Sequence, residues 1–159
     1  MRNPDLRAAL GRFPTGVAVV ATCAADGRPA GLTVNSVAPV ALAPARLLWS
    51  LGKRSRLRAA FETAAGFTVN VLGEDQEALA RQMSSPAADR FAGVVWRATR
   101  AGLPLLHGCV ATFECKTGSV AEIGDHIVFV GDIVAYESAG GAPLLYLSGR
   151  YSRLERAAA

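Results

Sequence analysis

Apolar residues near the start of the chain recur with the period of a helix. Leu6, Leu10 and Phe13 are separated by four and three positions, so they share one helical face. Asn3 can cap the first turn, and Pro4 suits the first helical position because that position needs no hydrogen-bonded N–H. The spacing therefore predicts a short helix in this segment.

From residue 16 onward the pattern changes to short apolar segments rich in Val, Thr and Leu. Gly, Pro or Asp-Gly separates these segments, as is typical of strands that are joined by turns. The predicted strands cover residues 16–24, 29–36, 46–52, 66–73, 109–117, 126–138 and 143–147.

Two segments between the strands carry the spacing of amphipathic helices. Residues 55–63 have apolar side chains at i, i+3 and i+4, and residues 74–84 begin with two carboxylates that suit the positive end of a helix dipole. The expected apolar faces consist of Leu57, Ala60 and Phe61 in the first helix, and of Ala78, Leu79, Gln82 and Met83 in the second.

The number of strands relative to helices predicts the fold class. A doubly wound parallel sheet needs a helix between each pair of strands, and only three short helices are expected here. The pattern therefore favours a mainly β fold with antiparallel strands, either a barrel or a sandwich.

Length and composition fit one compact domain. The chain has 159 residues, of which 51% are apolar and 19% are charged, and no repeat or low-complexity segment divides it. Residues 1–159 are therefore expected to form a single domain. The excess of 17 Lys and Arg over 13 Asp and Glu gives a net charge of +4, which favours small phosphate-bearing partners over nucleic acid.

Cysteine usage and hydropathy bear on where the protein works. Cys23, Cys109 and Cys115 form no Cys-x-x-Cys pair, so neither a disulfide framework nor a metal site is expected, and a cytoplasmic location is predicted.

An arginine interrupts the apolar run 37–51, so no membrane span is expected. The basic start before the apolar run 17–25 also fits a secretory signal, but the β-branched residues and the following Asp-Gly favour a strand that enters a hairpin.

The segment Ser50–Arg56 offers anion-binding chemistry. The sequence contains no Gly-x-Gly and no Gly-x-Ser-x-Gly, which argues against a dinucleotide fingerprint and a serine-hydrolase elbow. In 50–56 a strand ends, a glycine turns the chain, and a helix start at Ser55 lies among three cations. Backbone N–H groups beside ammonium and guanidinium groups can hold a phosphate. The alternative is a solvated basic face whose helix is capped by Ser55.

Polar side chains also gather at the end of the predicted strand 29–36. Thr33, Asn35 and Ser36 supply donors and acceptors within four residues, which suits the edge of a heterocycle with mixed polarity. The alternative is an Asx or Ser/Thr turn that closes the strand.

Two further strand ends carry candidate ligand contacts. His126 follows Gly-Asp and opens an apolar strand, so one ring nitrogen can meet a ligand while Asp125 or a carbonyl fixes the other. Arg150 and Tyr151 follow a strand near the end of the chain and can touch a second nucleotide. The alternatives are a structural histidine, and an aromatic plug with a snorkelling arginine.

Five segments, taken together and in order, resemble the short-chain flavin reductase family. They are Phe13-Pro14-Thr15-Gly16-Val17, Gly31-Leu32-Thr33-Val34-Asn35-Ser36, Phe67-Thr68-Val69-Asn70-Val71-Leu72, Gly124-Asp125-His126 and Pro143-Leu144-Leu145-Tyr146. The resemblance covers nearly the whole chain and rests on the order and spacing of the set. It implies an antiparallel, Greek-key-like, flavin-binding split β-barrel that works as a homodimer.

The resemblance also implies the site residues. Thr33, Val34, Asn35 and Ser36 would lie along the isoalloxazine ring and ribityl chain, with Ser50, Leu51, Lys53 and Ser55 around the flavin phosphate. His126 would face the nicotinamide as the catalytic orienting group and proton source, and Tyr151, with Arg150, would lie near the pyridine nucleotide.

The implied reaction is hydride transfer from NADH or NADPH to FAD or FMN, after which the reduced flavin leaves for a separate flavin-dependent monooxygenase. The protein needs only to stack the two rings and to stabilise charge on the reduced one. One departure from the family is the loop 37–46, which lacks the usual Ser-Leu-Asp-Pro-Pro-like run. The alternatives are a split-barrel flavoprotein with another redox or carrier role, and a basic β-domain that binds nucleic acid through residues 53–58.

Overall fold

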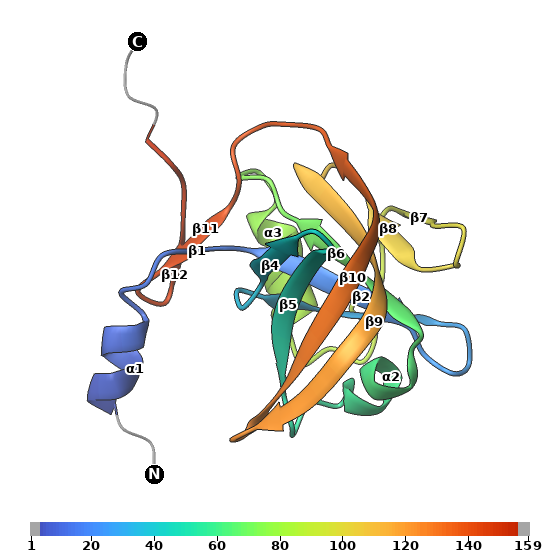
Figure 1. Ribbon diagram of the computed structural model, residues 1–159. Coiled ribbons are helices and arrows are strands. Elements are labelled where there is room, and N and C mark those ends of the chain that lie inside the picture. Colours follow the sequence, from blue (N-terminus) through green and yellow to red (C-terminus); the bar gives the residue numbers. More distant parts are fainter. Residues whose placement is uncertain (1–3, 156–159) are drawn as a thin grey trace.

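The computed structural model describes residues 4–155, which contain three short helices and twelve strands (Figure 1). The helices are α1 (Pro4–Leu10), α2 (Arg58–Thr63) and α3 (Glu77–Ser84). The strands are β1 (Thr15–Gly16), β2 (Ala18–Cys23), β3 (Pro29–Val34), β4 (Ala38–Leu42), β5 (Ala45–Gly52), β6 (Gly66–Val71), β7 (Trp96–Ala98), β8 (Pro104–Leu106), β9 (Ala111–Ile123), β10 (His126–Ser138), β11 (Leu145–Leu147) and β12 (Arg150–Ser152). Asn3, the expected helix cap, lies outside the described residues. Each described helix is too short to span a bilayer.

Seven antiparallel strands form the main sheet, in the order β3-β2-β6-β9-β10-β5-β4. Its longest hairpin joins β9 to β10, with His126 opposite Ile123 at one end and Ser138 opposite Ala111 at the other. The other edge of β10 pairs with β5, which places His126 opposite Gly52. The start of β10 and the end of β5 therefore meet at one end of the sheet.

The sheet curls around an apolar core. Trp49 stacks on Phe129 with ring centroids 4.8 Å apart, and meets Phe61 and Phe67 edge to face. These rings come from β5, β10, α2 and β6, and the same buried cluster contains Val34 of the edge strand β3. Since strands from across the sheet contribute to one core, the sheet is rolled into a barrel (Figure 1). The expected antiparallel, mainly β barrel is confirmed.

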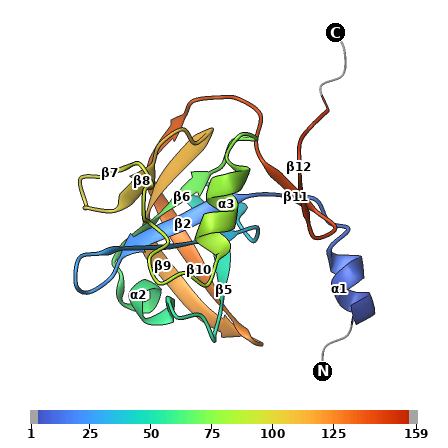
Figure 2. The same cartoon turned by 180° about the vertical axis from the view of Figure 1, so that it is seen from behind.

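A second apolar cluster covers the outside of the barrel. β2 is buried on both faces: Ala18 and Val20 belong to the inner cluster, whereas Val19 and Ala21 belong to the outer one. α3 and the segment that follows it pack over this outer face (Figure 2).

The buried face of α3 differs from the sequence prediction. Ala80 and Met83 are fully buried, Leu79 packs partly against the same cluster, and Ala78 is exposed. The helix begins at Glu77 rather than Glu74, and its contact with β3 and β2 decides which stripe is covered. Tertiary packing therefore rotated the face by part of a turn relative to the pattern.

The edge strand β4 replaces what the sequence suggested was an irregular loop. Residues 38–42 pair with β5 alone. Pro39 is tolerated there because an edge strand does not need every N–H for a ladder.

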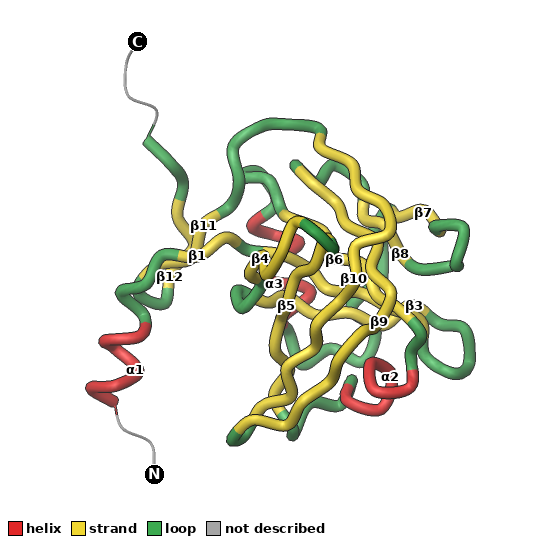
Figure 3. Tube along the Cα trace, in the orientation of Figure 1, coloured by secondary structure: helices red, strands yellow, loops and turns green. Residues whose placement is uncertain are grey.

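β1, β11 and β12 form a separate three-stranded sheet beside the barrel, and α1, which precedes β1 along the chain, lies on the side of this sheet away from the barrel (Figure 3). Leu6, Leu10 and Phe13 expose 56%, 67% and 75% of their surfaces. The apolar face predicted for the first segment is therefore largely open to solvent in this chain.

Candidate functional site

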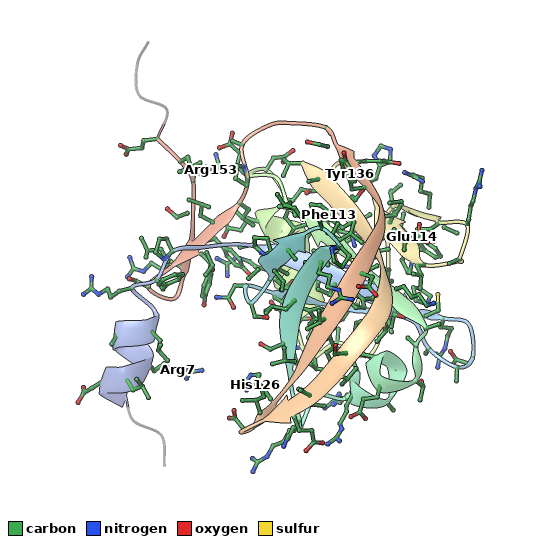
Figure 4. The ribbon with its side chains drawn as sticks, viewed as in Figure 1. Arg7, Phe113, Glu114, His126, Tyr136 and Arg153 are labelled. Atoms are coloured by element: carbon green, nitrogen blue, oxygen red, sulfur yellow. The ribbon has the colours of Figure 1, made fainter. Side chains whose placement is uncertain are left out.

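The paired ends of β5 and β10 hold His126 beside the turn that follows Gly52. The backbone N–H of Lys53 donates to the carbonyl of Asp125 at 3.0 Å, and a Cβ added at Gly52 would lie 3.9 Å from Nε2 of His126. The histidine side chain is half-exposed. Figure 4 shows His126 at the tip of the β9–β10 hairpin.

Asp125 fixes one face of the histidine. Its Oδ1 lies 2.7 Å from Nδ1 of His126, and this hydrogen bond, with the charge of the imidazole, holds the pKa of Asp125 below its ordinary value. Because a carboxylate only accepts, Nδ1 carries the proton in this pair. Nε2 makes no hydrogen bond within the described chain, so it is open to a further contact. The role in ligand binding expected for Gly124-Asp125-His126 stays a prediction.

Lys53 lies at the same strand end but is held by an acid. Its Nζ is 2.8 Å from Oε2 of Glu122, and Oε1 of Glu122 accepts from Nη2 of Arg58 at 2.8 Å. The hydrogen bond from Lys53 is the main reason that the pKa of Glu122 is lowered. An anion at Lys53 would therefore have to share the ammonium with Glu122.

The polar end of β3 is joined to β5 by a serine pair. The hydroxyl of Ser36 accepts from the N–H of Ser50 at 3.0 Å and is 3.3 Å from the Ser50 carbonyl oxygen. The Thr33 hydroxyl donates to the Ala80 carbonyl at 2.7 Å. Asn35 is exposed, and its amide makes no hydrogen bond within the described chain. Of these polar side chains, Asn35 is thus the one most available to a ligand.

A cavity of about 820 Å³ opens at the other end of β3, where Pro29, Ala30 and Gly31 line it. Its walls come from the β2–β3 hairpin, the start of α2, the segment between α3 and β7, and Trp96. Among the residues predicted for the flavin site, Ser55 lines the cavity. The Ser55 hydroxyl accepts from the N–H of Leu57 at 3.2 Å, which secures the turn before α2.

Four arginines that the site prediction did not include line the same cavity, and Arg28 of the β2–β3 hairpin is one of them. Arg54 and Arg56 stand on the turn before α2, and Arg90 follows the Ser-Ser-Pro loop after α3. Arg90 is partly buried, and donates from Nε to the Ser85 carbonyl at 2.8 Å and from Nη1 to the Gly31 carbonyl at 3.3 Å. Burial, and secondarily the charge of Arg56, lower the pKa of Arg90. The sequence offered one sign of this position, because Arg90 precedes the apolar Phe91 in a segment that otherwise shows no hydrophobic period.

Arg150 and Tyr151 lie apart from the His126 corner. Both belong to β12 in the small sheet, and Tyr151 packs edge to face against Tyr146 and under the guanidinium of Arg81, 5.0 Å from its ring centroid. Arg153, next after β12, lies away from His126 in Figure 4. Within the described chain the structure joins Ser36 to Ser50 and brings the backbone of Lys53 to the turn before His126, whereas the Lys53 ammonium is paired with Glu122. Arg150 and Tyr151 lie on the small sheet instead.

Solved structures share this architecture over nearly the full chain. The NADH:FAD oxidoreductase SgcE6 of Streptomyces globisporus, crystallised with NAD and FAD fragments, superposes with a TM-score of 0.89 at 33% identity, and the match covers 98% of this chain and 96% of that one. The flavin reductase component of styrene monooxygenase from Pseudomonas putida S12 gives a TM-score of 0.87 at 31% identity over 96% of this chain and 99% of that one. The split-barrel form of the fold, expected from the resemblance, is confirmed.

Curated relatives point to the same group. The reductase component of a flavin-dependent trigonelline monooxygenase from Acinetobacter baylyi is 43% identical over 147 residues, which are 92% of this chain and 47% of that protein. The FMN reductase (NADH) SmoA of Agrobacterium fabrum is 37% identical over 96% of this chain and 86% of its own length. The chain spans about half the length of the first two curated relatives that it matches. The family model described as "Flavin reductase like domain" matches residues 10–155, and the chain therefore belongs to the flavin reductase-like family.

Proposed function

We propose that this chain is an NAD(P)H-dependent flavin reductase that reduces FAD or FMN and supplies the reduced flavin to a separate monooxygenase. The observation that carries the proposal is the meeting of His126, Gly52 and the Ser36–Ser50 pair at one strand end in a chain 33% identical to an NADH:FAD oxidoreductase over nearly its whole length. Relatives named as reductase components of monooxygenases support the second half of the proposal.

The polar groups at the strand end fit a flavin. Asn35 offers an amide with no side-chain partner in the described chain, which can meet the mixed donors and acceptors of the ring edge. Ser50 and Lys53 follow on β5 and its turn, and Ser55 lines the cavity beyond them. The side chain of Leu51 is buried in the inner core, so only its backbone could contact a ligand. A bound flavin would supply the two-electron acceptor, and these residues would hold and orient it.

His126 would orient the nicotinamide. Because Asp125 holds Nδ1, Nε2 can donate to or accept from a substrate amide or phosphate in a fixed direction. Replacing His126 with Ala should raise the Michaelis constant for NADH or lower turnover while flavin affinity stays nearly the same. An unchanged dependence on NADH would remove this residue from the site.

A homodimer would cover the open apolar surface of α1 and of the turn that follows it. Leu10 and Phe13 expose 67% and 75% of their surfaces, which is unusual for large apolar side chains in a short amphipathic segment. We expect sedimentation velocity to give twice the mass of the chain, and Leu10→Glu with Phe13→Glu to shift the population toward the monomer. A monomeric parent protein would refute the dimer.

A cytoplasmic location is part of the proposal, since Cys23, Cys109 and Cys115 all carry free thiols.

The experiment that tests the reductase activity is NADH and NADPH oxidation at 340 nm, with FAD, FMN or riboflavin added in turn. Flavin-dependent oxidation would establish the activity and identify the preferred pair of substrates. A protein that binds flavin but oxidises neither nucleotide would instead be a split-barrel flavoprotein with another redox or carrier role.

A further inference from the structure

A second cavity, of about 370 Å³, lies at the open end of the β9–β10 hairpin, away from His126. Its walls include Thr112 near the start of β9 and Glu137 near the end of β10, which stand opposite one another. His126 begins β10, and Tyr136 marks the other end of that strand in Figure 4. Eleven residues of extended strand from His126 to Glu137 span about 36 Å. The cavity is therefore separate from the candidate site at His126.

The short strand β7 divides this cavity from the larger one. Trp96 lines the cavity of about 820 Å³, and the next residue, Arg97, lines the second cavity. Successive side chains of a strand point to opposite faces, so β7 presents one face to each space. Its partner strand β8 supplies Leu105 and Leu106 to the second cavity. The two cavities share no lining residue.

The second cavity contains a buried hydroxyl group without a partner. Thr112 exposes 8% of its surface, and its Oγ1 makes no hydrogen bond within residues 4–155 but remains accessible from the cavity. Thr112 stands opposite Glu137 of β10 and Asn70 of β6, so the three side chains share one face of the sheet. The Asn70 amide accepts from the N–H of Leu106 instead. A hydroxyl that is withdrawn from water without a partner favours a ligand that can hydrogen-bond to it.

His107 adds a second polar group, on a backbone that is fixed from both sides. Its N–H donates to the Val95 carbonyl at 3.0 Å, and its carbonyl accepts from Nε2 of Gln76 at 2.9 Å. The imidazole lines the cavity and makes no hydrogen bond in the part of the chain that the structure describes. A neutral imidazole donates from one ring nitrogen and accepts at the other, so it can pair with either end of a hydroxyl group.

The charged groups in the wall cancel one another. Nη2 of Arg97 is paired with Oε1 of Glu137, and these are the one guanidinium and the one carboxylate among the described residues that line the cavity. Burial raises the pKa of the Cys109 thiol to about 11, so this lining group is neutral at ordinary pH. Leu105 and Leu106 add apolar surface. A charged ligand would have to break the ion pair, whereas an uncharged one leaves it intact.

We propose that this cavity binds a small uncharged organic molecule that carries one hydroxyl group on an apolar body. Thr112 and His107 would hydrogen-bond to the hydroxyl group, and Leu105 and Leu106 would contact the body. The volume of about 370 Å³ is near the lower end of the range for ligand pockets, which suits a single ring better than a nucleotide. The inference goes beyond the reductase function and does not depend on it.

Fluorine NMR titration with three probes of matched shape tests the chemical class of the ligand. We expect 4-fluorobenzyl alcohol to bind with a dissociation constant of about 1 mM or less, a range typical of ligands this small. The probe 4-fluorotoluene lacks the hydroxyl group and should bind about fivefold more weakly. The anion 4-fluorobenzoate should also bind more weakly than the alcohol, because it would face Glu137. Equal binding of 4-fluorotoluene, or tighter binding of 4-fluorobenzoate, would overturn the proposal.

The variant Thr112→Val tests the hydrogen bond, because it keeps the branched shape and removes the hydroxyl. It should weaken binding of 4-fluorobenzyl alcohol about fivefold and leave binding of 4-fluorotoluene unchanged. Thr63→Val is the matched control, since it makes the same change on α2, where the hydroxyl donates to the Ala59 carbonyl at 2.8 Å. His107→Ala alters an exposed side chain and should fold like the parent protein, and it should weaken binding of the alcohol about threefold. Unchanged binding of the alcohol to His107→Ala and to folded Thr112→Val would overturn the proposal.

A competition with FMN tests the location. The dissociation constant of 4-fluorobenzyl alcohol should stay within about twofold when FMN is added, because sites without shared contacts act independently. Displacement of the alcohol by FMN would place it in the larger cavity and overturn the inference. No binding of the alcohol by a protein that oxidises NADH with flavin would overturn this inference alone. Binding of the alcohol by a protein that neither binds nor reduces flavin would support it and refute the reductase function.

Discussion

Asn70 links the two layers of the molecule, and its removal gives the sharpest test of how the barrel is held. Its side chain is fully buried on β6. The amide nitrogen donates to the Val19 carbonyl at 3.1 Å and to the Thr68 hydroxyl at 3.1 Å, and Oδ1 accepts from the N–H of Leu106 at 2.9 Å. The residue thus connects β2, β6 and the end of β8 by one amide.

The cost of Asn70→Ala follows from these contacts. The Leu106 N–H would lose its acceptor in a buried position, which costs about 1–3 kcal/mol. The lost bond to Val19 adds about 1 kcal/mol, and the space left by the amide adds about 1 kcal/mol more. We therefore expect a loss of about 3–5 kcal/mol in the free energy of unfolding, a large share of what a domain of this size commonly has.

Urea unfolding followed by tryptophan fluorescence measures this loss. An unchanged dependence of the unfolding free energy on urea concentration would show that the folded and unfolded states expose the same surface as in the parent protein. Asn35→Ala is the control, because the same substitution at this exposed position should change the free energy by less than about 0.5 kcal/mol. A loss below about 1 kcal/mol for Asn70→Ala, at constant slope, would show that water replaces the amide and that the link does not hold the layers together.

Three further changes test other parts of the core. Trp49→Phe should cost less than about 1.5 kcal/mol or stabilise the protein in urea titration, because the buried Nε1 of Trp49 has no hydrogen-bond partner and its loss offsets part of the lost packing. Gly131→Ala should cost about 2 kcal/mol or more in thermal unfolding, because the added Cβ would lie 2.6 Å from Phe67 Cζ and 2.8 Å from Cys115 Cβ; a wild-type midpoint would refute this contact. Burial raises the pKa of Cys109 to about 11 and of Cys115 to about 12, from 9.0. The unfolded chain therefore ionises these thiols first, so stability should fall as the pH rises above about 9, by about 1.4 kcal/mol per thiol at pH 10. Replacing both cysteines with Ala should flatten that slope, and an unchanged slope would assign it to other groups.

The strands were predictable because their apolar residues face a core on one or both sides. The strand predicted over 126–138 matches β10 at both ends, since Gly-Asp before it and the Gly-Gly and Pro of residues 140–143 after it mark its limits. β4 was missed because Pro39 argues against a strand unless the strand lies at an edge. The short strands β7 and β8 were missed because three residues are too few to show a period.

Helix boundaries were harder to predict than helix positions. α2 begins at Arg58 rather than Ser55, because the Ser55 hydroxyl closes a turn with the N–H of Leu57 and delays the helix. The predicted face nevertheless holds in part, since Phe61 is buried and Leu57 packs against the inner core. Local hydrogen bonds of this kind compete with helical ones and are not visible in a spacing pattern.

The two parts of the candidate site differ in how far a sequence can reveal them. The part at His126 and Ser50 depends on two strands whose register brings both residues to one end of the sheet, and short motifs mark those strand ends. The cavity part depends on Arg56 and Arg90, which are brought together only when the segment after α3 folds back over the barrel. The net charge of +4 for the whole chain does not indicate that positively charged side chains gather in one cavity. Because the two parts lie on different segments, we expect a substitution at Arg56 to leave the His126–Asp125 pair unchanged, and a substitution at His126 to leave the cavity wall unchanged.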